Sequence, residues 1–91
     1  MMDHDAEQSA RDLFEALART ADAIAETAEA SARVHDRAVA HLPGAAEHAQ
    51  RERRFAAAER AAAVAYRNHE VPPDEVRQVI RDSGRGPAVS G

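Results

Sequence analysis

The chain has 91 residues, a formal net charge of -4 and a hydrophobic fraction of 44%. Alanine supplies 23 of the hydrophobic residues, whereas Leu, Ile, Val and Phe together number only 14. This composition leaves room for one small domain and excludes a large, self-sufficient hydrophobic core. The net charge is too small to make disorder the expected state of the chain.

The absence of cysteine excludes disulfides, thiolate zinc sites and cysteine nucleophiles. No apolar run approaches the roughly 18 residues of a transmembrane helix, and the acidic N-terminus lacks the basic-then-apolar order of a signal peptide. We therefore expect a cytoplasmic protein with no membrane partner. All 12 basic residues are arginine, which together with the alanine content is typical of a GC-rich bacterial genome.

The first predicted helix covers about 5–42, a segment without glycine or proline that is dominated by alanine, the strongest helix former. Small and apolar residues recur along it at alternating steps of four and three, which is the spacing of a coiled-coil seam. Charged residues occupy the other face. The predicted seam consists of Ala10, Phe14, Leu17, Ala21, Ile24, Ala28, Ser31, His35, Ala38 and Leu42.

Pro43 and Gly44 interrupt this pattern and end the first helix. A second, less apolar helix is expected over about 45–69. Because the connection is short, the two helices should fold back on each other as an antiparallel hairpin. Pairing the helices outward from the turn places His35 near Glu52.

The charge distribution agrees with a hairpin. Residues 1–36 carry nine acids and three arginines, a net charge of -6, whereas residues 37–67 carry three acids and six arginines, a net charge of +3. An acidic helix beside a basic one avoids like-charge repulsion. Exposed ion pairs contribute only tenths of a kcal/mol each, so they favour a partner without driving the fold.

A third helix is expected over about 73–83, because acids follow Pro73 in the pattern of a helix start. Val76, Val79 and Ile80 form one apolar face on this helix.

We expect that face to cap the end of the hairpin at Phe14 and Leu17. Residues 85–91 are predicted to form a disordered tail. The predicted fold is therefore all-α, a single domain over 1–84 with a long antiparallel helical hairpin and a short third helix.

A hairpin with a thin alanine seam buries little surface. Burial of a Leu or Phe side chain contributes about 1.5–3 kcal/mol and an alanine methyl far less, whereas ordering each residue costs about 1–2 kcal/mol. We therefore predict a homodimer that forms a four-helix bundle. The predicted interface comprises Phe14, Leu17, Ala21, Ile24, Ala28, Ser31, His35, Leu42 and Phe55.

Three side chains offer an alternative, a divalent metal site. His48 and Glu52 are four residues apart and share a helix face, and the hairpin brings His35 close to them. Two imidazoles and a carboxylate suit a metal such as zinc. A histidine that simply hydrogen-bonds Glu52 explains the same residues without a cofactor.

Other chemistry has little basis in the sequence. Arg51, Arg53 and Arg54 could contact phosphate, but the acidic chain makes nucleic acid an unexpected partner. No Ser–His–acid arrangement, phosphate-binding loop or nucleotide fingerprint is present. We expect no catalytic residues and no enzymatic activity.

The second helix ends in a Tyr-x-x-x-Glu sequence, Tyr66 to Glu70. In this motif and in hairpin length the chain resembles the small secreted hairpin proteins of the WXG100 family, although Leu42-Pro43-Gly44 stands where that family has a Trp-x-Gly turn. The resemblance implies a small secreted helical-hairpin protein as another alternative. The function predicted from the residues is a non-enzymatic helical interaction or oligomerisation module, such as a small bacterial regulatory protein, that binds itself or another helical protein.

Overall fold

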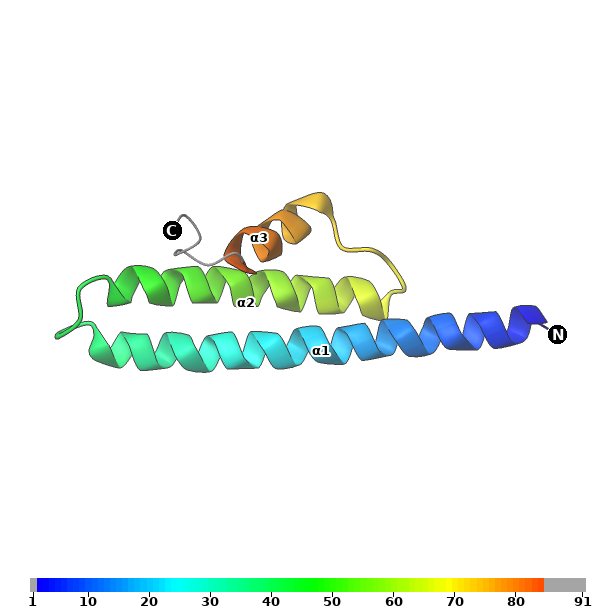
Figure 1. Ribbon diagram of the computed structural model, residues 1–91, viewed down its shortest axis with the longest axis horizontal. Coiled ribbons are helices and arrows are strands. Elements are labelled where there is room, and N and C mark those ends of the chain that lie inside the picture. Colours follow the sequence, from blue (N-terminus) through cyan, green and yellow to red (C-terminus); the bar gives the residue numbers. More distant parts are fainter. Residues whose placement is uncertain (1, 85–91) are drawn as a thin grey trace.

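The computed structural model describes residues 2–84 and contains three helices, α1 (Met2–Ala38), α2 (Ala45–Arg67) and α3 (Asp74–Gly84) (Figure 1). No strand occurs in this part of the chain. The expected all-α class is thereby confirmed. The predicted disordered tail, 85–91, lies outside the described residues.

The helix boundaries differ from the predicted ones by a few residues. α1 begins at Met2, because the helix-favouring sequence and its acids extend to the N-terminal end of the chain. It ends at Ala38 instead of about 42, and the turn that follows includes a hydrogen bond from the Leu42 amide to the Ala38 carbonyl of 2.8 Å. The residue before a proline disfavours helical geometry, so Leu42 belongs to the turn.

Two residues with positive φ set the ends of α2. Gly44, at φ 84°, reverses the chain before the helix begins. After the helix, His69 adopts φ 58°, and the Glu70 amide donates to the Ala65 carbonyl at 2.8 Å. This hydrogen bond is the signature of a Schellman helix end, which explains why α2 stops at Arg67 rather than at about 69.

The helices α1 and α2 run side by side in opposite directions, and α3 lies against α2 (Figure 1). Every buried apolar side chain that lies on the three helices is an alanine, and among the described residues no large side chain is fully buried. Two clusters illustrate the contact between α1 and α2. One joins Ala18 and Ala21 to Ala63, and the other joins Ala25 and Ala28 to Ala56.

This contact occupies only part of the seam predicted for α1. Its buried residues are Ala18, Ala21, Ala25, Ala28 and Ala32. The larger members of the predicted seam lie beside it, and Ile24 is 37% exposed. The predicted single stripe is therefore two stripes, an alanine stripe that faces α2 and a second stripe beside it that includes Leu17 and Ile24.

The expected position of α3 is wrong. Within the described chain no Cα atom of α3 lies within 8 Å of α1, so α3 packs on α2 alone. Phe14 instead stacks on the His69 ring, with ring centroids 5.3 Å apart, and lies 6.5 Å from the Tyr66 ring. The aromatic residues at the end of α2 thus occupy the place that the third helix was expected to cap.

Candidate functional site

Between residues 12 and 36, charge is confined to one side of α1. Every Asp, Glu and Arg between residues 12 and 36 belongs to a stripe with steps of three and four. Its members are Asp12, Glu15, Arg19, Asp22, Glu26, Glu29, Arg33 and Asp36. With 3.6 residues per turn, this spacing keeps all eight on a single sector of the helix. The remaining circumference of α1 is uncharged over more than six turns.

The helix α2 covers only half of the uncharged surface. The other half, called the outer face below, comprises Leu13, Ala16, Leu17, Thr20, Ala23, Ile24, Thr27, Ala30, Ser31 and Val34. Seven of these ten residues are exposed and three are half-buried. Leu13 is 59% exposed and Val34 is 57% exposed. An uncharged strip of this length on a small protein is typical of an interaction surface.

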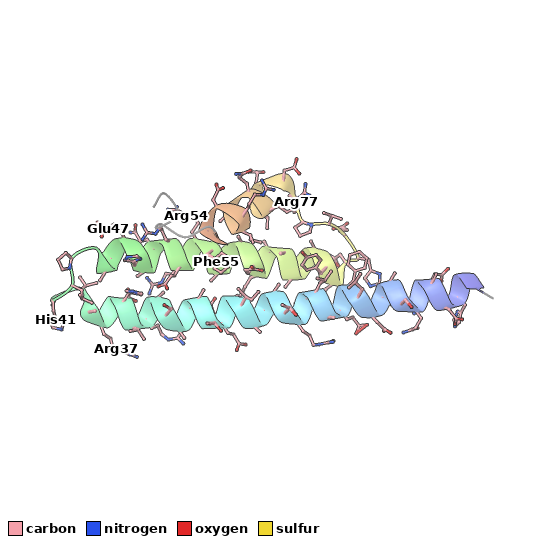
Figure 2. The ribbon with its side chains drawn as sticks, viewed as in Figure 1. Arg37, His41, Glu47, Arg54, Phe55 and Arg77 are labelled. Carbon is pink, nitrogen blue, oxygen red and sulfur yellow. The ribbon has the colours of Figure 1, made fainter. Side chains whose placement is uncertain are left out.

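A groove runs beside the middle of the outer face, with a volume of about 560 Å³. Thr20, Ile24, Thr27 and Ser31 line it from α1, and Phe55 lines it from α2. Phe55 also packs on the alanine cluster beneath. Its ring lies in the middle third of α2 (Figure 2), so the groove combines an aromatic side chain with aliphatic and hydroxyl groups.

An ion-pair ladder joins α1 to α2 along one edge of the hairpin. Arg53, Arg60 and Arg67 are spaced by seven residues. They pair with three acids of the same spacing on α1, namely Asp36, Glu29 and Asp22 respectively, and Arg60 also reaches Asp22.

The ladder holds two carboxyl groups in their ionised form. The Arg60 Nη2 atom lies 2.8 Å from the Glu29 Oε1 atom, and hydrogen bonding by this guanidinium lowers the pKa of Glu29. Asp36 has a lowered pKa for the same reason, because Arg53 donates to its carboxylate. Neither carboxyl group is therefore available as a proton donor near neutral pH.

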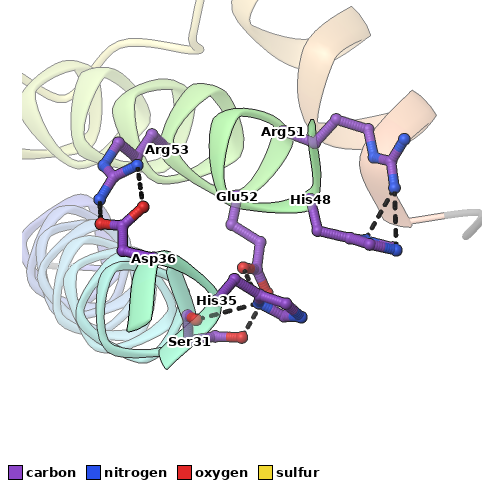
Figure 3. Close-up of polar contacts among 7 residues, drawn as sticks. All are labelled: Ser31, His35, Asp36, His48, Arg51, Glu52 and Arg53. Atoms are coloured by element: carbon purple, nitrogen blue, oxygen red, sulfur yellow. Dashed lines mark hydrogen bonds and ion pairs between the residues drawn. The ribbon is translucent and has the colours of Figure 1, made fainter. Parts of the chain in front are cut away.

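The predicted metal-site residues do come together, but as a hydrogen-bonded cluster (Figure 3). The His35 Nδ1 atom lies 2.9 Å from Glu52 Oε1 and 3.0 Å from the Ser31 carbonyl oxygen. The Ser31 hydroxyl donates to the other Glu52 oxygen. His48 stacks on His35 with ring centroids 5.2 Å apart, and its Nδ1 atom accepts a hydrogen bond from Arg51.

These contacts engage both carboxylate oxygens of Glu52 and the Nδ1 atoms of both histidines. The His35 Nδ1 faces two acceptors, and the His48 Nδ1 is engaged by a guanidinium. Over residues 2–84 no group of three His, Asp or Glu side chains has a geometry that could hold a metal ion. The arrangement is that of a polar contact across the helix interface.

Glu59 interrupts the alanine contact between α1 and α2. The residue is only 7% exposed, and burial raises the pKa of its carboxyl group. No side-chain oxygen of the described residues is both buried and without a hydrogen-bond partner. The aliphatic part of Glu59 therefore packs in the interface while its carboxylate remains in touch with solvent.

The predicted interface residues fall into three groups. Those already used inside the hairpin are Phe14, Ala21, Ala28, Ser31 and His35. Leu42 is 55% exposed in the turn. Leu17, Ile24 and Phe55 lie on the outer face or in its groove.

The sequence interpretation missed other members of the outer face. These are Leu13, Ala16, Thr20, Ala23, Thr27, Ala30 and Val34, which lie further around the helix than the predicted seam. The signal that could have identified them is the confinement of charge to a single stripe, which shows how wide the uncharged surface is. The ladder could also have been found, from the shared seven-residue spacing of its acids and arginines.

Comparison with known proteins gives no relative. Neither a family model, nor a curated protein, nor a solved structure matches the chain. None of the described helices combines the length and the apolar character that crossing a membrane requires.

Proposed function

We propose that the protein is a non-enzymatic helical interaction module that uses the outer face of α1 to bind a second helical surface. Its favoured form is a homodimer in which the α1 and α2 helices of two copies make a four-helix bundle. The single observation that carries the proposal is the distribution of large side chains. Alanines fill the contact between α1 and α2, whereas Leu13, Ile24 and Val34 remain exposed.

The energetics support association. Burying a Leu, Ile or Val side chain contributes about 1.5–3 kcal/mol, and the monomer leaves several such contributions unused. The small Ala16, Ala23 and Ala30 lie among these larger side chains, so a partner helix can approach α1 closely and gain dispersion contacts with its backbone.

The position of α3 restricts where a partner can dock. α3 packs on α2 and leaves α1 uncovered. The proposal therefore assigns association to α1 rather than to the whole face of the hairpin, and it places an α1 pair at the centre of the bundle.

Sedimentation equilibrium between micromolar and millimolar protein tests this proposal. We expect wild type to move from a mass of 9.8 kDa toward twice that value. Ile24→Arg should stay monomeric, because it places a charge in the middle of the outer face. The matched control is Val64→Arg, which changes a 58% exposed valine of α2 away from the outer face.

The control should associate as wild type does. Circular dichroism shows whether each variant keeps its helices. Equal association of Ile24→Arg and wild type, in the homodimer or in complexes captured from the native host, would refute the role of the outer face.

A further inference from the structure

Charged residues of alternating sign border the outer face on the side away from α2. They are Asp12, Arg19, Glu26 and Arg33, spaced by seven residues. All four are exposed, and none forms an ion pair with another residue in the described part of the chain. Their order is therefore negative, positive, negative, positive along the rim of an apolar surface.

This order is complementary to itself only when two copies run in opposite directions. In a two-fold antiparallel pair, Arg19 of each copy meets Glu26 of the other, and Asp12 of each meets Arg33 of the other. In a parallel two-fold pair the rims of the two copies lie on opposite edges of the contact, so the rim charges of one copy do not meet those of the other. Charge complementarity at the rim thus selects both a partner and its direction.

The apolar residues fit the same alignment. When the rim charges pair in this way, Ala23 lies beside its own copy at the two-fold axis and Thr20 lies opposite Thr27. Leu13 lies opposite Val34, so the two large side chains that are most exposed on the outer face cover each other. No charged residue of one copy meets the apolar stripe of the other.

The N-terminal part of α1 supports this arrangement independently. It projects beyond the end of α2 (Figure 1), and residues 4–13 are all exposed. In an antiparallel pair centred on Ala23, residues 4–13 lie opposite residues 33–42 of the other copy, which form the end of α1 and the turn that follows it.

We infer that two copies of this chain associate through an antiparallel pair of α1 helices with Arg19–Glu26 and Asp12–Arg33 ion pairs at its rim. This inference rests on the proposed function, since it assigns the partner and the geometry of the same outer face. Because the contact is two-fold symmetric, each ion pair occurs twice.

Two charge reversals test the inference. Arg19→Glu and Glu26→Arg each convert two attractive pairs into two repulsive ones, so each should weaken the homodimer about tenfold at low salt. The loss should shrink at high salt, because screening acts on exposed charges. Arg54→Glu on α2, an exposed position away from the outer face, makes the same change of charge and should leave the dimer unaffected.

Mixing the two variants gives the decisive measurement. A heterodimer of Arg19→Glu with Glu26→Arg restores an opposite charge at both Arg19–Glu26 positions, so the mixture should associate with nearly wild-type affinity. Native mass spectrometry distinguishes this heterodimer from both homodimers when one variant is isotope-labelled.

The possible failures are distinguishable. A wild-type dimer whose variants do not recover on mixing overturns the antiparallel geometry and leaves the proposed function intact. A wild-type chain that stays monomeric at millimolar concentration overturns this inference together with the proposed self-association.

Discussion

Substitution of Ala63 by leucine tests whether the alanine contact between α1 and α2 is closely packed. Ala63 is fully buried and faces Ala18 and Ala21. A leucine there adds three carbon atoms between two helices whose separation is set by methyl groups. If the contact is closely packed, these atoms force the helices apart or into strained rotamers.

The two possible outcomes have opposite signs. Overpacking a well-packed site costs about 1–3 kcal/mol, whereas filling an existing gap with a leucine side chain would contribute about 1.5–3 kcal/mol of stability. For a domain of this size, 1 kcal/mol corresponds to about 4–8 °C in Tm. We expect Ala63→Leu to lower Tm by about 4–24 °C.

Thermal unfolding followed by circular dichroism at a fixed protein concentration measures this change, since association makes Tm concentration-dependent. Ala61→Leu is the matched control, because Ala61 is exposed on the same helix and leucine is nearly as helix-favouring as alanine. A Tm that rises in Ala63→Leu but not in Ala61→Leu would refute the close packing of the alanine contact.

Further predictions concern the turn and the titratable groups. Gly44→Ala should lower the free energy of unfolding by about 1 kcal/mol, because the residue adopts φ 84°. No atom lies within 4 Å of an added Cβ, so the cost comes from the backbone conformation. Urea denaturation measures this change. The pKa values of Glu29 and Asp36 are lowered in the folded state, so these carboxylates stabilise the fold at pH values above their ordinary pKa values of 4.5 and 3.8. This stabilisation should be lost as the pH falls through their folded-state pKa values. A Tm at pH 2 equal to that at neutral pH would contradict this. Glu59 has a raised pKa and so behaves in the opposite way, since its ionised form disfavours folding at neutral pH. Glu59→Gln should raise Tm at pH 7, and the gain should vanish as pH falls below 4.5.

The helices and their ends could be predicted from the sequence because local signals determine them. The long segment without glycine or proline and the Pro43-Gly44 break are sufficient to indicate α1 and α2. The predicted helix boundaries are wrong by a few residues where non-local contacts or an unusual backbone conformation determine the end of the helix. His69 takes a left-handed conformation that a sequence pattern would assign to glycine.

The packing of the helices was harder to predict. Alanine is compatible with both a core and a surface, so an alanine-rich stripe does not reveal which of its edges faces a neighbour. Because large apolar side chains are usually buried, the sequence predicts Leu17 and Ile24 as core residues. In the structure α2 approaches α1 closely and packs on the smaller residues beside them.

The hydrophobic periodicity of α3 shows which of its faces is apolar but does not show which helix that face packs on. Its three apolar residues can dock on any nearby apolar surface, and the prolines that precede α3 direct the chain back over α2. The candidate polar cluster was predicted in part, since the contact between His35 and Glu52 follows from counting residues outward from the turn.

The ion-pair ladder has a consequence for alignment. Because its arginines and its acids repeat at the same interval, sliding one helix past the other by seven residues would bring Arg53 to Glu29, Arg60 to Asp22 and Arg67 to Glu15. The ladder therefore allows a second alignment with three ion pairs, but that slide would replace Ala18 and Ala21 opposite Ala63 with Arg11 and Phe14.

Features that occur once in the described chain also favour the native alignment. They are the short turn at Gly44, the contact of Glu52 with Ser31 and His35, and the stacking of Phe14 on the end of α2. The alignment of the two helices is thus determined by the alanine contact and by a few residues that occur once, and not by the ion-pair ladder alone.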